Sequence, residues 1–278
     1  MKLSDFKILF YDKLKFTIEH NELNEFFFWL IKFYCGIDRL NYVMDSNLVL
    51  SKIQETNLLK SIELIKSNMP IQYVIGETEF MNLKFLVNKN VLIPRPETEE
   101  LVSWILMEKL NNKAILDVGT GSGCIAISLS KFSESSNVTA WDIEKKIIDL
   151  AKKNALLNEV EVFFELEDIR SVKSKKKFDI IVSNPPYICK KEKSKMKKNV
   201  LHFEPHIALF VDDNDPLFFY SMILNHAKKN LKKNGKIFLE INENKTKPVL
   251  KLLENKGFTN IELKQDFRGK DRMVKAFI

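Results

Sequence analysis

Cysteine, histidine and glycine are scarce in this chain, which has three Cys, four His and eight Gly among 278 residues. Cys35, Cys124 and Cys189 are odd in number and widely spaced, so the sequence predicts neither a disulfide framework nor a zinc cluster. The histidines form no ligand pattern with the cysteines, and we expect no metal site. The scarcity of cysteine indicates a reducing compartment.

Long hydrophobic runs are also lacking. The most apolar stretch, EFFFWLIKFYCGI, is shorter than the ~20 residues that cross a bilayer, and it contains Lys32. The first residues show no charged-then-apolar signal pattern. We therefore expect a cytoplasmic protein with no membrane partner.

Charge of one sign is not concentrated in the chain. Lys and Arg number 44 against 37 Asp and Glu, a net charge of +7, but the lysines are spread along the sequence. We therefore expect no direct nucleic-acid partner. The basic run KKEKSKMKK, Lys190 to Lys198, is typical of a solvated loop or helix, and the sequence does not decide whether it contacts a substrate.

Two regions with different patterns follow each other along the chain. Residues 1–71 show the three- and four-residue spacing of amphipathic helices, with one helix expected to stop at Gly36 and another to begin after Thr56. Alternating residues in 72–95 predict a β-hairpin linker. Residues 96–278 form the expected catalytic domain.

Strand-like and helix-like segments alternate in that second region. Such alternation predicts an α/β fold with a mostly parallel, seven-stranded, Rossmann-like sheet covered by helices on both faces. The expected strands are Ala114–Val118, Val138–Asp142, Val160–Phe164, Phe178–Val182, Lys236–Ile241, Phe258–Leu263 and Met273–Phe277. No clear helix separates the last two, so we expect them to pair antiparallel.

A glycine-rich turn follows the first expected strand, in AILDVGTGSGCIAISL. Gly119, Gly121 and Gly123 permit a tight turn and a close approach of backbone to a ligand at the carboxyl edge of the sheet. Their spacing differs from the dinucleotide-binding fingerprint. Asp117 adds a negative charge that suits a cationic ligand or an ammonium group.

Acidic residues end the next two strands. Asp142 falls where a carboxylate accepts hydrogen bonds from both ribose hydroxyls. Asp168 is positioned to accept from an adenine amino group, with Ile169 against the ring. These residues in this order predict S-adenosylmethionine as cofactor and a class I methyltransferase fold. The predicted cofactor-binding residues are Asp117, Gly119, Thr120, Gly121, Ser122, Gly123, Asp142, Ile143, Asp168, Ile169 and Asn184.

The sequence SNPPYI follows the fourth expected strand. Asn184 and the Pro185 carbonyl offer two acceptors for the N–H groups of a planar NH₂, and the prolines keep the carbonyl in place. Those acceptors bind more strongly as the nitrogen gains positive charge during methyl transfer. Tyr187 offers a face for stacking. Asn184, Pro185 and Tyr187 are therefore the predicted catalytic residues; glutamine, asparagine, adenine and cytosine all remain possible acceptors.

Four ordered motifs give the chain a specific resemblance. IPRPETEELV, DVGTGSG, NPPYI and FEPHIAL, with PIQYVIGETEF before them, resemble the protein-glutamine methyltransferases that modify peptide-chain release factors. The resemblance implies a helical N-terminal domain that binds the release factor together with the catalytic domain. It also implies that Asn184, Pro185, Pro186 and Tyr187 bind the glutamine of a Gly-Gly-Gln tripeptide.

Three alternatives stay open at this point. A glutamine methyltransferase of a ribosomal protein would carry the same loop. An adenine-specific nucleic-acid methyltransferase would use the same residues on a flipped base, normally with an added basic and aromatic recognition region. A non-catalytic cofactor-binding module would show no turnover. The motifs do not disclose the preferred release factor, the oligomeric state or the kinetic constants.

Overall fold

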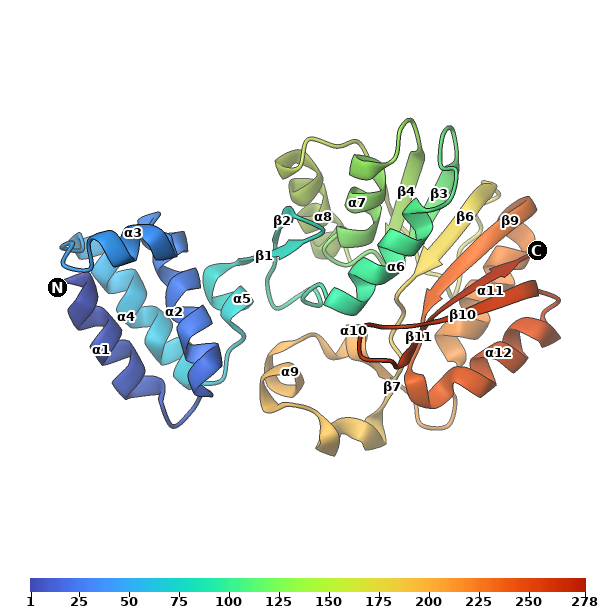
Figure 1. Ribbon diagram of the computed structural model, residues 1–278. Coiled ribbons are helices and arrows are strands. Elements are labelled where there is room, and N and C mark those ends of the chain that lie inside the picture. Colours follow the sequence, from blue (N-terminus) through green and yellow to red (C-terminus); the bar gives the residue numbers. More distant parts are fainter. The chain divides into compact units, whose positions relative to one another are not determined.

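The computed structural model describes residues 1–278, which divide into two compact units (Figure 1). The helical unit comprises Met1–Gly76 and Lys197–Phe203, and the sheet unit comprises Glu77–Met196 and Glu204–Ile278. No helix in either unit has the length and apolar character needed to span a membrane.

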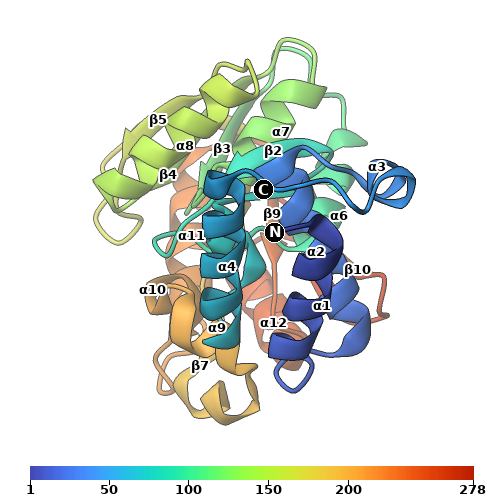
Figure 2. The ribbon, with the colours of Figure 1, turned by 90° about the vertical axis from the view of Figure 1, so that its left-hand side faces the viewer.

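The helical unit is built around three helices that pack against one another (Figure 2). Its elements are α1 (Leu3–Leu14), α2 (His20–Cys35), α3 (Arg39–Met44), α4 (Lys52–Lys66), α5 (Ile71–Ile75) and α9 (Lys198–Phe203). The apolar faces of α1, α2 and α4 meet in one core that contains Phe6, Phe10 and Phe27. This core contains no residue of the sheet unit.

The ends of these helices follow local capping chemistry. As predicted, α2 ends at Gly36, which has φ 70° and takes the left-handed conformation that glycine adopts without strain. The predicted cap at Thr56 is wrong. Ser51 caps α4 in a reciprocal capping box with Gln54, whereas Thr56 lies inside the helix and donates to the Lys52 carbonyl.

A hairpin opens the sheet unit. Strands β1 (Glu77–Phe80) and β2 (Leu83–Leu86) pair antiparallel, and Phe80 and Phe85 belong to the core of the sheet unit. The first residues of the predicted linker instead form α5, and the division between the units falls after Gly76. The domain limits 1–71, 72–95 and 96–278 stay a prediction. The division into two units differs from them in placing residues 72–76 and 197–203 with the helical unit.

The main sheet has seven strands in the order β10-β11-β9-β6-β3-β4-β5. Strands β9, β6, β3, β4 and β5 run parallel, and β11 pairs antiparallel with both β9 and β10, so the predicted sheet is confirmed. Its strands are β3 (Ala114–Val118), β4 (Asn137–Asp142), β5 (Phe163–Leu166), β6 (Phe178–Ser183), β9 (Leu231–Glu240), β10 (Thr259–Gln265) and β11 (Asp271–Phe277).

Helices cover both faces of this sheet (Figure 1). One face packs against α6 (Pro96–Leu106), α7 (Cys124–Phe132) and α8 (Lys145–Leu157), and the other against α11 (Phe218–Asn230) and α12 (Thr246–Asn255). Successive strand residues point to opposite faces, so Ile115 joins the first core and Leu116 the second. Burial on both sides explains why the central strands β3 and β6 read as continuous apolar runs.

Short elements complete the sheet unit after β6. A two-residue parallel pair joins β7 (Ile188–Cys189) to β8 (Phe210–Val211), and α10 (His206–Leu209) precedes β8. The basic run begins as the 3₁₀ helix η1 (Lys190–Lys195), and η2 (Glu243–Lys245) follows β9.

Candidate active site

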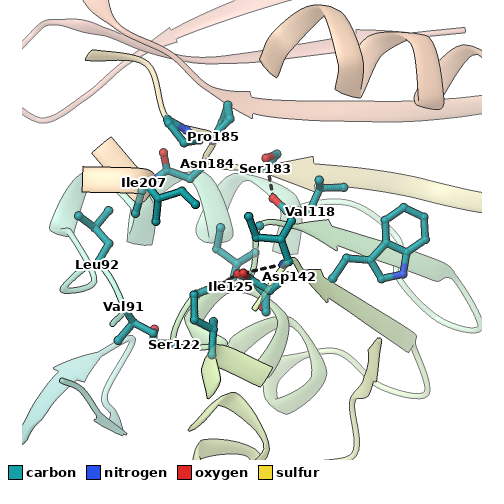
Figure 3. Close-up of a pocket in the computed structure, with 18 of the residues that line it drawn as sticks. Val91, Leu92, Val118, Ser122, Ile125, Asp142, Ser183, Asn184, Pro185 and Ile207 are labelled. Atoms are coloured by element: carbon teal, nitrogen blue, oxygen red, sulfur yellow. Dashed lines mark hydrogen bonds between the residues drawn. The ribbon is translucent and has the colours of Figure 1, made fainter. Parts of the chain in front are cut away.

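A cavity of about 160 Å³ lies where the parallel strands β3, β4 and β6 end (Figure 3). The carboxyl edge of an open α/β sheet is the usual ligand site of such folds, because loops from neighbouring strands converge there. Ten of the predicted site residues line the cavity. They are Gly119, Thr120, Gly121, Ser122, Asp142, Ile143, Ile169, Asn184, Pro185 and Pro186.

Four predicted site residues lie outside this lining: Asp117, Gly123, Asp168 and Tyr187. Gly123 is the N-cap residue that precedes α7, with φ 87°, and a Cβ at this position would meet Ile127 Cδ1 at 2.8 Å. Gly123 is therefore required by the packing of α7, and its contact with a cofactor stays a prediction.

Asp117 lies beneath the glycine turn and is fully buried. Its Oδ2 accepts a 2.6 Å hydrogen bond from Thr120 Oγ1, while its Oδ1 has no hydrogen-bond partner. Burial raises the pKa of Asp117 to about 7. A buried acceptor without a donor fits a ligand that brings its own donor, such as an ammonium group reached directly or through water.

Asp142 ends β4 and faces the cavity. Its Oδ2 accepts from the Gly121 N–H at 3.0 Å and its Oδ1 from the Ile143 N–H at 2.8 Å. These two backbone N–H groups hold the Asp142 carboxylate in place at the cavity (Figure 3). Each oxygen keeps a further lone pair for a ligand hydroxyl. Burial raises the pKa of Asp142, and the backbone hydrogen bonds oppose that shift.

The next strand end differs in detail from the expected adenine pocket. Ile169 lines the cavity, whereas Asp168 pairs with the Arg170 guanidinium at 2.6 Å and lies outside the lining. Glu167 is the acidic residue of this segment that reaches the cavity wall. The assignment of Asp168 to an adenine amino group stays a prediction. Together with Asp117 and Asp142, the apolar wall at Ile169 fits S-adenosylmethionine, which carries an ammonium, a ribose and an adenine.

The NPPY loop begins directly after β6. Ser183 donates to the Val118 carbonyl at 2.7 Å and ties the loop to the neighbouring strand β3. Asn184 and Pro185 then reach the cavity (Figure 3). The Tyr187 ring packs against the second core, and its hydroxyl donates to Glu240 Oε1 at 3.1 Å. Stacking of Tyr187 on a substrate stays a prediction.

Two buried polar residues that sequence reasoning had not assigned support this loop. The Asn184 side-chain Nδ2 donates to Thr98 Oγ1 at 3.2 Å, and Thr98 donates to Glu240 Oε2 at 2.6 Å. Thr98 and Glu240 are 2% and 1% exposed, so water does not compete for these hydrogen bonds. The only sequence signal for Glu240 is an acidic residue that closes an apolar strand, KIFLE.

A second unassigned pair holds the wall of the cavity before α6. Glu204, which is 3% exposed, accepts from the Arg95 guanidinium at 2.6 Å and from the Ile93 N–H at 3.3 Å. Arg95 and its neighbours Leu92 and Pro94 line the cavity. The motif FEPHIAL therefore has a structural role here, because its glutamate anchors a distant segment.

Comparisons with known proteins agree with this architecture. Residues 98–203 match the family described as methyltransferase small domain. A solved methyltransferase from Pyrococcus furiosus has a TM-score of 0.54 at 17% identity, covering 82% of this chain and 98% of that one, which shows the shared fold.

Relatives of higher identity span nearly the whole chain. A release factor glutamine methyltransferase of Flavobacterium psychrophilum is 45% identical over 286 residues, with 99% of each chain covered. A protein of the same name from Bacteroides thetaiotaomicron is 40% identical over 243 residues, with 87% of each covered. This chain therefore belongs to the release factor glutamine methyltransferase family.

Proposed function

We propose that this protein transfers a methyl group from S-adenosylmethionine to the side-chain amide nitrogen of the glutamine in the Gly-Gly-Gln tripeptide of peptide-chain release factors. Release factors are then its direct partners, and its place of action is the cytoplasm. The observation that carries the proposal is the orientation of Asn184, whose Nδ2 is bonded to Thr98. Its Oδ1 is then free to accept from a substrate NH₂ in the cavity.

The cofactor supplies a methyl group on a positively charged sulfur when it is bound. Asp142 would hold the ribose end, and Asp117 lies beneath the turn that would receive the amino acid end, where the positive charge of the ligand's ammonium group favours the ionised form of this carboxyl. A Cβ on Gly119 or Gly121 would point into open space, so the requirement for glycine at both positions comes from their positive φ, which shapes the turn. These residues bind and orient the methyl donor.

The NPPY loop prepares the acceptor nitrogen. A neutral carboxamide nitrogen is a weak nucleophile because its lone pair is delocalised into the carbonyl. Asn184 Oδ1 and the Pro185 carbonyl take the two N–H groups and hold the nitrogen with its lone pair aimed along the line of attack. As positive charge develops on the nitrogen, both hydrogen bonds strengthen, which lowers the barrier more than it strengthens substrate binding. The new N–C bond would replace the bond between the methyl carbon and sulfur, whose electrons stay on the sulfur as a neutral thioether, and the nitrogen would release one proton to water.

The same acceptors explain why a carboxylate is excluded. A glutamate side chain would place oxygen lone pairs against the oxygens of Asn184 and Pro185, with no hydrogen between them. Sites built to bond an N–H discriminate by ~10⁴ or more against an analogue that lacks it. The enzyme is therefore expected to methylate glutamine and to leave glutamate unmodified.

Incubation with labelled S-adenosylmethionine tests the proposal. Parallel reactions contain release factor, its variant with Glu in place of the tripeptide Gln, ribosomal proteins, and DNA or RNA oligonucleotides. We expect label only in the release factor with its natural sequence, at the glutamine of the tripeptide. Label confined to a ribosomal protein or to an oligonucleotide would overturn the choice of substrate and support one of the other acceptor classes.

A further inference from the structure

The hydrogen-bond polarity of Asn184 is set by groups that lie behind the cavity. A side-chain amide has nearly the same shape after a 180° flip, so packing alone distinguishes its oxygen from its nitrogen poorly. The flip nevertheless decides the chemistry of the site. With Oδ1 toward the cavity Asn184 accepts from a substrate NH₂, whereas with Nδ2 toward the cavity it would oppose one donor with another.

The hydrogen-bond network that reaches Asn184 begins at Glu240, the last residue of β9. It is 1% exposed and receives two hydroxyl donors, Thr98 at 2.6 Å on Oε2 and Tyr187 at 3.1 Å on Oε1. An ionised carboxylate has no hydrogen of its own and can only accept. Both hydroxyl hydrogens are therefore directed at Glu240.

The surroundings of Glu240 shift its pKa in opposite directions. Burial raises the pKa of Glu240, and the nearby carboxylate of Glu97 adds to this shift. Hydrogen bonds from Thr98 and Tyr187 and the positive charge of Arg272 oppose it. The net shift of this pKa is upward, and the acceptor role of Glu240 is shown by geometry, because each of its two oxygens lies within hydrogen-bond distance of a hydroxyl.

Thr98, in the first turn of α6, connects Glu240 to Asn184 in this network. A hydroxyl has a single hydrogen, and here it points to Glu240. The Thr98 oxygen can then serve Asn184 only as an acceptor. Asn184 must present its NH₂ to Thr98, at an Nδ2 to Oγ1 distance of 3.2 Å, and its Oδ1 is turned to the opposite side.

We propose that Glu240 and Thr98 are positioning residues that fix the amide orientation of Asn184 and so determine that the site accepts a carboxamide and rejects a carboxylate. Thr98 and Asn184 line the cavity, whereas Glu240 does not, so Glu240 acts through its partners. The inference rests on the proposed function for its choice of substrate. The orientation of Asn184 itself does not depend on that choice.

Replacing the carboxylate by an amide tests the polarity directly. Glu240→Gln keeps the shape but introduces an NH₂ that can donate to Thr98, so the Thr98 hydrogen is released toward Asn184, which can then flip. We expect methylation of release factor to fall by about tenfold to a hundredfold, the usual cost of opposing buried polar groups. Binding of the release factor variant that carries Glu in the tripeptide should become tighter relative to the Gln form.

Two variants of Thr98 separate hydrogen bonding from packing. Thr98→Val keeps the shape without the hydroxyl, and it should show the same loss of methylation and of discrimination between Gln and Glu. Thr98→Ser keeps the hydroxyl and should restore both. Tyr220→Phe is the matched control, because the Tyr220 hydroxyl donates to the backbone carbonyl of Glu240 at 3.1 Å and not to its carboxylate. It should leave the discrimination unchanged.

The measurements are the rate of methyl transfer, the dissociation constants of the Gln and Glu forms of release factor, and that of the cofactor, with thermal unfolding to verify the fold. Unchanged discrimination between Gln and Glu in folded Glu240→Gln and Thr98→Val would overturn the inference. A shift in the ratio of the two constants with constant cofactor affinity supports it.

Neutron diffraction on crystals of the full chain gives a readout independent of substrate. Deuterium positions identify the Asn184 nitrogen, which should face Thr98 in the unmodified protein and turn away from it in Glu240→Gln. If the wild-type protein fails to methylate any release factor, the proposed function alone is refuted. If Asn184 has the same orientation in the wild-type protein and in Glu240→Gln, the positioning role alone is refuted.

Discussion

Asp117 combines full burial with an oxygen that has no hydrogen-bond donor. Its pKa is raised from 3.8 to about 7, chiefly because burial penalises the charged form. Below pH 4 the carboxyl is protonated in both the folded and the unfolded chain. Between pH 4 and 7 only the unfolded chain ionises, so the stability contributed by the protonated carboxyl is lost as pH rises.

Substitution of Asp117 should therefore change the pH dependence of stability. In the absence of ligand, the free energy of unfolding of the unmodified protein relative to Asp117→Asn should fall by a few kcal/mol from pH 4 to pH 7 and then level off. Denaturant unfolding at several pH values measures the difference. Parallel curves for the two proteins would contradict the raised pKa.

Asn184 is the residue whose loss should separate chemistry from cofactor binding. Asn184→Ala removes one of the two acceptors for the substrate N–H groups, and we expect methyl transfer to fall by at least about a hundredfold. Affinity for the cofactor, measured by calorimetry, should fall much less. Asn255→Ala, on the exposed end of α12, is the control with full activity. Equal activity of both variants would remove Asn184 from the mechanism.

The connection from β3 to α7 shows how one element constrains both stability and site. A Cβ on Gly123 would lie 2.8 Å from Ile127 Cδ1 and 3.3 Å from the Ala151 Cβ, and φ is 87°. Gly257 has a similar φ of 84°, but its nearest neighbour is Lys228 Nζ at 3.9 Å. The two glycines therefore share nearly the same φ and differ in how crowded the space for a Cβ is.

This pair gives a matched test at the level of the element. Gly257→Ala should cost about 1–2 kcal/mol, the price of a left-handed alanine. Gly123→Ala should cost more, because α7 must also move away from the new methyl group, and it should weaken cofactor binding as the turn shifts. Denaturant unfolding and calorimetry measure the two effects. Equal destabilisation would show that crowding at Gly123 is relieved without cost.

At the scale of the whole molecule, the cores of the two units are separate. The core of the helical unit is formed within residues 1–75, and both cores of the sheet unit lie after residue 79. Each unit thus buries its own apolar surface, which is the requirement for folding alone. In the proposed function, the helical unit serves to bind the release factor.

Removal of residues 1–76 should therefore leave a folded protein that binds S-adenosylmethionine. Residues 197–203 lose their partners in this fragment, but the strands around the cavity keep theirs. We expect cofactor affinity within about threefold of that of the full chain. Methylation of release factor should fall strongly, since the release factor can no longer bind to the helical unit. A fragment that methylates release factor as well as the full chain would contradict this role of the helical unit.

Much of the fold followed from local patterns. Runs such as AILDV and FDIIV read as buried strands because each is covered on both faces, and α2 ends at Gly36 because glycine takes a positive φ without strain. The third expected strand is placed less exactly by its pattern: β5 is Phe163–Leu166, shifted from the expected Val160–Phe164. Short exposed strands carry weaker apolar signals.

The sequence by itself determined the order of strands and helices, the glycine turn and the NPPY loop, because each depends on residues a few positions apart. Only the tertiary structure decided which buried partners support that loop. Thr98 and Glu240 are 142 residues apart, and Arg95 and Glu204 are 109 apart, so no local pattern joins them. Their pairing arises because loops, a helix start and a strand end that are distant in the sequence converge at one edge of the sheet, where buried polar groups must find partners.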